Sequence, residues 1–382
     1  MITGSAGDHR CGVGDYAWCL AQFLAIDAEV DLYYARDHAP VDPPFRKLKK
    51  LRLMPVGGYS VLAIPALANR LSLGGYDIVH LQYPSKGYGT SVGPGVLFSR
   101  LTGMQSRSRL VLTLHEWSTS HPLRRRLSEQ ILSATDGLLV TNEAELEKII
   151  NVFTLRPVTA LPVGNVTRAP AQLESIWMAF EGTAVPGLPA ITGPHTRERC
   201  SIFHYGLPAK GKGIGRLLEA LSIVRKTGIE ATLHFYGDLP AGDQLGEEVL
   251  GFISKFGLSD AVVRGGHIPQ QELEATATRY AVGVFPFDEG YSSKRSSIAS
   301  ISHIELPLVV GGGSREEHPY YAPEENTAKS LAVLLVDLFK GRLEQEWTGQ
   351  IEQQREYAVR FSFPRLASAH LEFYRKLRRE IA

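Results

Sequence analysis

The stretch FHYGLPAKGKGIGRLLEAL (residues 203–221) joins an apolar run, a loop with three glycines and two lysines, and a run with the apolar spacing of a helix. A strand, a glycine-rich loop and a helix in this order are typical of parallel α/β sheets. Lys212 stands at the end of the loop, where its charge and the N–H groups of the helix start can converge on a diphosphate. The loop lacks the G-x-x-x-x-G-K-[ST] spacing of a P-loop, which disfavours ATP hydrolysis. Solvated lysines are the alternative interpretation.

Short apolar runs of the same kind recur on both sides of this stretch. They are EVDLYYA (29–35), DIVHLQY (77–83), RLVLTLHE (109–116), GLLVTN (137–142), VTALPVG (158–164), ATLHFYG (231–237), AVVRGG (261–266), VGVFPF (282–287) and LPLVVGG (306–312). Near-continuous apolar strands that alternate with helices form parallel sheets buried on both faces. The sequence therefore predicts an α/β fold of two doubly wound, Rossmann-like domains, whose crevices at the carboxyl ends of the strands face a central cleft.

The segment between the two sets of strands is rich in Pro, Gly and Ala, and only AQLESIWMAF (171–180) has the pattern of a helix. Such a change in composition indicates an interdomain linker. We expect a first domain at residues 1–168, the linker at 169–199 and a second domain at 200–365.

Composition excludes several classes of protein. The 382 residues are 44% apolar, and 41 Lys+Arg balance 40 Asp+Glu to a net charge of +1, so no global field favours nucleic acid. The cysteines, Cys11, Cys19 and Cys200, are too few and too irregularly spaced for a disulfide framework or a zinc site, which fits a reducing compartment. No apolar run approaches the roughly 20 residues of a membrane span, and the start lacks a signal-peptide pattern. We expect a cytoplasmic protein.

Two further motifs follow predicted strands in the first half of the chain. Gly12 and Gly14, with Asp15, precede an apolar helix in GDHRCGVGDYAWCLAQFL (7–24), where glycines let backbone N–H groups approach a ligand. An ordinary tight turn explains the two glycines equally simply. His115 and Glu116 follow RLVLTL directly, at the strand end where α/β folds project polar groups toward ligands. A structural histidine is the alternative there.

The stretch DEGYSSKRSSIASISHIELPLVVGGG (288–313) places Lys294 and Arg295 among four serines where a helix is predicted to start. Cations at the positive end of a helix are unfavourable unless an anion lies among them. The stretch therefore indicates a phosphate-binding site.

In combination, these motifs resemble the GT-B glycosyltransferases, specifically the large retaining class called family 4. The resemblance rests on Gly206 followed by Lys212 and Gly213, and it covers nearly the whole chain. The other segments that carry it are DIVHLQYP (77–84), DGLLVTNEAELEKI (136–149), LHFYGD (233–238), GGHIPQQELEATATRYAVGVFPF (265–287) and RFSFPRLASAHLEFYRKL (360–377). The resemblance implies an N-terminal acceptor-binding domain, a C-terminal donor-binding domain and a C-terminal helix, about 366–382, that crosses back to the first domain.

The chain departs from this family at two places. The paired-glutamate motif E-x7-E should fall at positions 292 and 300, which are Ser292 and Ser300 here, and the arginine that usually follows the first loop glycine is Leu207. Glu289 could bind a ribose or sugar hydroxyl from a shifted loop, and Lys294 and Arg295 could supply the missing cation.

The resemblance implies transfer of a hexose from a nucleotide-diphosphate sugar, UDP-glucose favoured, with retention of anomeric configuration. Preorganised cations would stabilise the leaving diphosphate, so the expected catalytic residues are Lys212 and Arg295, with His115 against the donor sugar. The expected donor-binding residues are Gly12, Gly14, Asp15, Gly206, Lys210, Gly237, Asp238, Glu289, Gly290, Ser292, Lys294, Ser296 and Ser297. Because no D-x-D occurs in the chain, we expect no metal and no cofactor beyond the donor substrate.

Several alternatives stay open. GDP-mannose competes with UDP-glucose as donor, a GT-B epimerase would need no acceptor, and a non-catalytic nucleotide-sugar-binding homologue is consistent with the missing glutamates. A dehydrogenase is disfavoured because no complete G-x-G-x-x-G with its downstream acid occurs. The acceptor is expected to be a glycan or a lipid-linked sugar of polysaccharide biosynthesis. The basic segments FRKLKKLR (45–52) and PLRRRLSEQ (122–130) are expected to be solvated helix faces, and peripheral membrane contact through them stays open.

Overall fold

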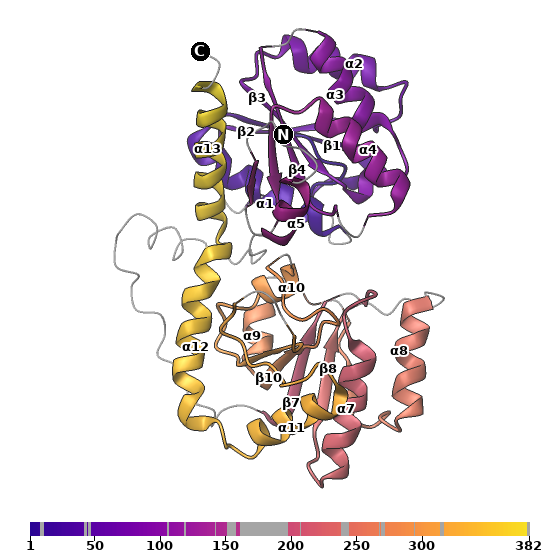
Figure 1. The fold of residues 1–382 in the computed structure, drawn as a ribbon, viewed down its shortest axis with the longest axis vertical. Coiled ribbons are helices and arrows are strands. Elements are labelled where there is room, and N and C mark those ends of the chain that lie inside the picture. Colours follow the sequence, from indigo (N-terminus) through magenta and orange to yellow (C-terminus); the bar gives the residue numbers. More distant parts are fainter. Residues whose placement is uncertain are drawn as a thin grey trace. The chain divides into compact units, whose positions relative to one another are not determined.

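The computed structural model divides the chain into two compact units, Met1–Val166 with Phe361–Ala382 (unit 1) and Thr167–Arg360 (unit 2) (Figure 1). It describes residues 1–379 except 8–10, 42–43, 45–46, 105–106, 118–119, 142, 151–157, 161–197, 207, 238–243, 267, 269–271, 294 and 314–316. No helix within these residues is long and apolar enough to cross a membrane.

Unit 1 contains a parallel sheet. Its strands are β1 (Val30–Ala35), β2 (Leu51–Val56), β3 (Ile78–Tyr83), β4 (Arg109–Leu114), β5 (Gly137–Val140) and β6 (Val158–Ala160). Ile2 bridges β1 and β3 through Tyr33 and Leu81, which gives the order β2-β1-Ile2-β3-β4-β5-β6. The strand order reverses at Ile2, and in doubly wound folds the ligand crevice lies at the carboxyl ends of the strands around such a reversal.

Helices cover both faces of this sheet. They are α1 (Gly12–Asp27), α2 (Ile64–Leu73), α3 (Gly93–Gly103), α4 (Pro122–Ser133), α5 (Glu143–Ile150) and α13 (Phe363–Arg379). The last of these packs on α1 and the sheet, since Phe363 stacks on Phe23, and Phe373 and Leu377 join Val111 and Leu139 in a small apolar cluster. Gly137 permits this contact: a Cβ there would lie 2.6 Å from Leu377 Cδ1.

Unit 2 contains a second parallel sheet, of order β11-β10-β7-β8-β9. Its strands are β7 (Glu198–Tyr205), β8 (Thr232–Tyr236), β9 (Val262–Arg264), β10 (Tyr280–Phe285) and β11 (Leu308–Val310). Its helices are α7 (Ile214–Lys226), α8 (Gln244–Lys255), α9 (Leu273–Ala277), α10 (Ser296–Ala299), α11 (Ala328–Phe339) and α12 (Glu344–Ala358). The order reverses between β7 and β10, so the crevice of this unit is expected beside their carboxyl ends.

The predicted α/β fold with parallel sheets is confirmed, and a strand occupies each of the predicted apolar runs. The sequence did not predict β2. The expectation of a helix face at 45–52 is wrong, because its last two residues begin β2 and the two before them form a turn. The helix predicted at 171–180 and the linker at 169–199 lie outside the described residues, apart from Glu198 and Arg199, which begin β7.

Candidate functional site

Two cations of unit 2 lie against the same aromatic ring. The ammonium of Lys212 lies 5.3 Å and the guanidinium carbon of Arg295 4.5 Å from the centre of the Phe287 ring. Lys212 Nζ also donates a 3.5 Å hydrogen bond to the buried hydroxyl of Ser297. Residues 83 positions apart in the chain are thus brought together at the carboxyl ends of β7 and β10, where the strand order reverses.

The two cations of this cluster are partly removed from water. Among the described residues, neither Lys212 nor Arg295 forms an ion pair, and Arg295 Nε is buried without a hydrogen-bond partner. Burial, and then the charge of Arg295, lower the pKa of Lys212 to about 8. Burial also lowers the pKa of Arg295, against the opposing influence of Glu289 and Asp288. Two partly desolvated positive charges without a close counter-ion favour an anionic ligand.

Glycine backbone shapes the loop that leads to Lys212. Gly206 has φ +134°, and a Cβ there would lie 3.7 Å from Lys212 Nζ, so the loop's backbone passes close to the ammonium. Gly213, at the N-cap of α7, has φ +66°, and a Cβ there would lie 1.7 Å from the carbonyl oxygen of Pro286. A side chain at position 213 would therefore separate this loop from the segment that carries Phe287.

Arg216, on the first turn of α7, holds the segment after β10 in place. Its guanidinium donates to the carbonyl oxygen of Pro286 (3.0 Å), to Asn326 Oδ1 (2.7 Å) and to Asp288 Oδ1 (2.8 Å). Asn326 Nδ2 in turn donates to the carbonyls of Phe287 and Asp288. These bonds fix the backbone around Phe287, and with it the ring on which both cations lie.

The glycine loop of unit 1 is built around Cys11. This cysteine is the N-cap of α1, and its sulfur accepts hydrogen bonds from the N–H groups of Gly14 (3.4 Å) and Lys86 (3.3 Å). Gly14 packs closely on Ser5, with a Cβ there 2.4 Å from the Ser5 hydroxyl oxygen, whereas Gly12 has open space. Cys11 is buried, and its sulfur satisfies two backbone donors.

His115 begins a buried hydrogen-bond network in unit 1. Its Nε2 lies 2.9 Å from Gln82 Oε1, and Gln82 Nε2 lies 3.2 Å from His80 Nε2. His80 Nδ1 lies 2.6 Å from the hydroxyl of Tyr374 on α13. Burial, and then the proximity of His370, lower the pKa of His115 to about 3, so its imidazole is neutral at physiological pH. A neutral ring suits a hydrogen bond to a substrate hydroxyl better than stabilisation of a phosphate.

The predicted site residues fall into three groups. The first group meets in unit 2 and consists of Gly206, Lys212, Arg295 and Ser297. Gly237 packs on Gly206, because a Cβ at Gly237 would lie 2.2 Å from the Gly206 carbonyl oxygen. Gly12, Gly14 and Asp15 lie at the start of α1 in unit 1, whose Tyr16 ring packs edge-on against His115 with centroids 5.1 Å apart.

The third group stands apart from these contacts. Glu289 and Lys210 are exposed, Ser292 is half-buried, and Gly290 turns with φ +76°. Asp238 and Lys294 lie outside the described residues, as does the side chain of Ser296. The predicted helix begins at Ser296 but contains only four residues, so its dipole adds little to the charges of Lys212 and Arg295.

Sequence reasoning missed Phe287, Arg216, Asn326 and Gln82. Phe287 lies in the run VGVFPF, which the sequence pattern assigns to a strand. Its position just beyond the end of β10, where ligands bind in such sheets, is the feature that could have identified it as a site residue. Arg216 and Asn326 are 110 residues apart, and no local pattern connects them. Gln82, a polar residue inside an apolar strand, is the kind of residue that an alternation pattern flags.

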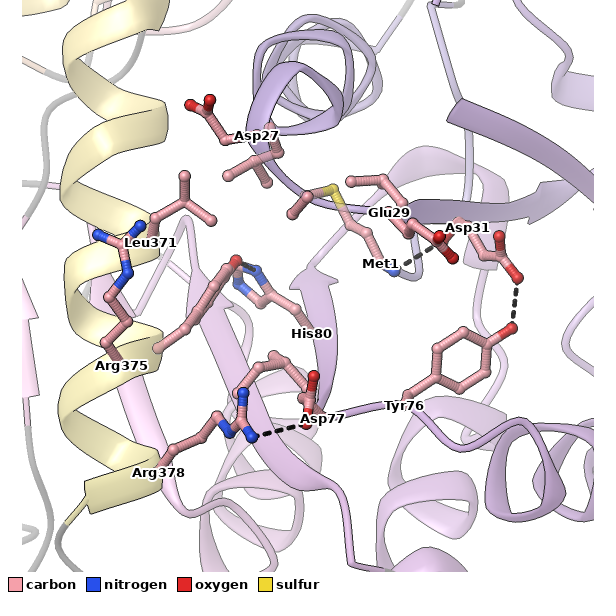
Figure 2. Close-up of a pocket in the computed structure, with 15 residues that line it drawn as sticks. Met1, Asp27, Glu29, Asp31, Tyr76, Asp77, His80, Leu371, Arg375 and Arg378 are labelled. Atoms are coloured by element: carbon pink, nitrogen blue, oxygen red, sulfur yellow. Dashed lines mark hydrogen bonds and ion pairs between the residues drawn. The ribbon is translucent and has the colours of Figure 1, made fainter. Parts of the chain in front are cut away.

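A further cavity of about 300 Å³ opens at the amino ends of β1 and β3 in unit 1, and His80 and Tyr374 of the His115 network line part of it (Figure 2). Asp27, Glu29 and Asp31 lie on one side of it and Arg375 and Arg378 of α13 on the other, with Arg378 paired to Asp77 at 3.2 Å. The Arg378–Asp77 ion pair joins α13 to the residue before β3.

Comparison with solved structures identifies the fold. The chain superposes on a sucrose-phosphate synthase from Thermosynechococcus elongatus with a TM-score of 0.68 and 18% identity, covering 98% of both chains. A glycosyltransferase from Rickettsia africae gives a TM-score of 0.68 at 14% identity over 99% of this chain and 97% of that one. HepE of Anabaena, in complex with UDP and glucose, gives 0.67 at 14% identity over 98% of both chains. No protein-family model matches the sequence, and no curated protein is significantly similar to it. The chain has the GT-B fold.

Proposed function

We propose that this protein is a retaining glycosyltransferase of the family 4 kind, which transfers a hexose from a nucleotide-diphosphate sugar to a glycan or glycolipid acceptor in polysaccharide biosynthesis. One observation carries the proposal: Lys212 and Arg295, partly buried and without an ion-pair partner among the described residues, meet on Phe287 at the carboxyl ends of β7 and β10. The fold shared with glycosyltransferases over nearly the whole chain supports it. UDP-glucose is the favoured donor, because HepE of Anabaena was crystallised with it, and GDP-mannose is the competing donor.

In the proposed reaction, the bond between the anomeric carbon and the diphosphate oxygen breaks as the acceptor oxygen bonds to that carbon on the same face. The acceptor proton passes to the departing phosphate oxygen, and the nucleoside diphosphate leaves. Lys212 and Arg295 stabilise the negative charge that grows on the diphosphate, and they do so without reorganisation because packing already holds them. They supply the charge that a metal would otherwise supply, so the proposed reaction needs no divalent ion.

The remaining site residues have roles in the same scheme. Gly206, Gly213 and Ser297 would bring backbone and hydroxyl donors to the diphosphate, and His115 would contact the sugar. Exposed Glu289 would bind a hydroxyl of the ribose or the sugar in place of the missing glutamates.

A melting-temperature screen of the purified protein against UDP, UDP-glucose, UDP-N-acetylglucosamine, GDP and GDP-mannose, with and without EDTA, tests the proposal. Ligands that bind only the folded state raise the melting temperature. We expect a shift with UDP and UDP-glucose that EDTA does not change. A shift with GDP and GDP-mannose alone would mean that the donor is a GDP-sugar and not UDP-glucose. No shift with any compound would refute the proposal.

A non-catalytic nucleotide-sugar-binding role is the second candidate, favoured by Ser292 and Ser300 at the positions of the paired glutamates. Release of UDP from UDP-glucose, measured with a coupled assay over a panel of acceptors, separates the two. Binding without release under any condition would favour the non-catalytic role.

A further inference from the structure

Four polar side chains interrupt the apolar strands β3 and β4 at alternating positions. They are His80 and Gln82 on β3, and Thr113 on β4 with His115 just beyond its end. Side chains two residues apart in a strand point to the same face of a sheet. Because the register pairs Gln82 with Thr113, the polar groups of both strands share one face. All four residues are buried.

Helix α13 covers this face and adds a further polar group. Tyr374 and His370 are four residues apart on α13, so both lie on one side of the helix. Figure 2 shows His80 on β3 facing α13, and the Tyr374 hydroxyl lies 2.6 Å from His80 Nδ1. Hydrogen bonds therefore run from Tyr374 through His80 and Gln82 to His115, and we call these four residues the polar chain.

The amide of Gln82 gives the polar chain a direction. Its Oε1 can only accept and lies 2.9 Å from His115 Nε2, so that nitrogen carries the hydrogen. Its Nε2 can only donate and lies 3.2 Å from His80 Nε2, which is therefore an acceptor and also takes the Thr113 hydroxyl at 2.7 Å. Burial lowers the pKa of His80, so its ring is neutral and carries its hydrogen on Nδ1, which donates to Tyr374.

This direction leaves His115 with one bare nitrogen, Nδ1, because the ring is neutral and its hydrogen is on Nε2. Within the described part of the chain, no group forms a hydrogen bond with His115 Nδ1. A bare imidazole nitrogen accepts hydrogen bonds and cannot donate one. It therefore suits a ligand hydroxyl that donates.

A second contact holds the ring of His115 in place. The Tyr16 ring packs edge-on against it, with centroids 5.1 Å apart. His370 Nδ1 donates to the Leu366 carbonyl oxygen at 2.6 Å, so its Nε2 is free to accept from the Tyr16 hydroxyl at 3.4 Å. Tyr16 thus fixes the position of the ring, while Gln82 fixes which nitrogen carries the hydrogen.

We propose that Gln82, His80 and Tyr374 are positioning residues for His115. They keep its hydrogen on Nε2, so that Nδ1 accepts a hydrogen bond from a hydroxyl of the bound hexose. The identity of the ligand rests on the proposed function, whereas the tautomer is a property of the chain without ligand. Partners that orient a functional histidine through its other ring nitrogen act in this way in many sites.

Nuclear magnetic resonance of the full chain, labelled with ¹⁵N at histidine and free of ligand, tests the tautomer. Correlation spectra through two and three bonds distinguish the nitrogen that carries the hydrogen from the bare one, and His115→Gln identifies the signals. We expect a single tautomer with the hydrogen on Nε2. Gln82→Met keeps the side-chain length but removes both hydrogen bonds, so both tautomers of His115 should appear.

Tyr374→Phe tests the relay along the polar chain. It removes the group that accepts the hydrogen of His80, and a buried N–H without a partner is unfavourable. His80 should then move its hydrogen to Nε2, the Gln82 amide should turn over, and the second tautomer of His115 should become populated. A residue that only packs on the sheet would not change the signals of a histidine two side chains away.

The control is Gln22→Met. Gln22 is a buried glutamine of α1 in the same unit and does not belong to the polar chain. Its replacement should leave the His115 signals unchanged. Circular dichroism of each variant checks that the fold is retained.

Calorimetric titration with UDP-glucose and with UDP measures the consequence for the sugar. Gln82→Met should weaken UDP-glucose binding about threefold to tenfold, the effect of one hydrogen bond, and leave UDP binding unchanged because UDP has no hexose. Equal losses for the two ligands would contradict the contact with the sugar.

Three outcomes of the spectra would overturn the proposal: a hydrogen on Nδ1 of His115 in the unaltered chain, a single unchanged tautomer in both Gln82→Met and Tyr374→Phe, or an equal change in Gln22→Met. Failure of the proposed function would instead show as no binding of UDP or UDP-glucose by the unaltered chain. The two failures are therefore separate results.

Discussion

At the scale of single residues, the pairing of Lys212 and Arg295 on Phe287 determines how the protein would hold an anion. Arg295→Ala removes one of the two charges and should weaken UDP binding about 10- to 100-fold, because hydrogen bonds to charged groups contribute about 1.5–3 kcal/mol each. Isothermal titration calorimetry measures the change.

Arg225→Ala is the matched control for this loss. Arg225 lies in the last turn of α7 in the same unit, where it pairs with Asp260 at 2.6 Å. Its removal should leave UDP affinity unchanged, and equal losses for Arg225→Ala and Arg295→Ala would place the anion elsewhere.

Because Lys212 loses its proton at moderately basic pH, we expect the affinity for UDP to depend on pH. The pKa of Lys212 is lowered to about 8 in the folded protein, so the ammonium loses its proton above that pH and no longer attracts phosphate. UDP affinity should therefore change little near pH 7, begin to fall as the pH approaches 8, and fall by up to about tenfold per pH unit above it. In Lys212→Arg the charge persists to higher pH, so a variant that still binds should show a flat profile. An unchanged fall in that variant would mean that another group titrates.

The lowered pKa of Lys212 also makes stability depend on pH, in the opposite direction to UDP affinity. Folding favours the neutral amine of Lys212, so the unfolded chain binds more protons between the folded pKa near 8 and the ordinary lysine pKa of 10.5. This group alone therefore makes the free energy of unfolding rise with pH across that window, while affinity for UDP falls.

At the scale of elements, α13 packs against β5, whose first residue is Gly137. Gly137→Ala should destabilise unit 1 by about 1–3 kcal/mol, because the new methyl group would overlap Leu377 and Phe373. Urea unfolding followed by circular dichroism measures this loss. Gly103→Ala, at the end of α3 with open space around the site, is the control and should not destabilise. Equal effects of the two variants would show that the packing of α13 on β5 is unimportant for stability.

The elements differ in how far the sequence predicts them. The buried strands and α7 follow from local patterns: apolar runs, the glycine loop and helical spacing. The edge strand β2, LRLMPV, is half exposed and contains a proline, so it lacks the apolar run of a central strand, and the basic residues before it resemble a helix face. The Gly206 loop was likewise predictable from spacing. Contacts such as Lys212 with Ser297, 85 residues apart, depend on how β7 and β10 pair, and no local pattern contains that pairing.

At the scale of the whole molecule, the two predicted ligand-binding clusters belong to different units. UDP should slow backbone hydrogen exchange in residues 208–214 and 295–301 of unit 2, whereas unit 1 should be nearly unaffected by UDP alone, since Lys212 and Arg295 both lie in unit 2. Mass spectrometry of exchanged peptides measures this. Protection confined to residues 11–17 of unit 1 would contradict the assignment of the diphosphate to unit 2.

The place of α13 in the chain bears on how the protein is made. This helix contributes Phe373 and Leu377 to a cluster with Val111 and Leu139, yet the ribosome synthesises it after all of unit 2. Domains usually fold in the order of their synthesis. Here unit 1 emerges first but lacks α13 until the end of synthesis, so unit 2 can complete its core before unit 1 does. Until then, α13 does not cover the apolar surface of β4 and β5.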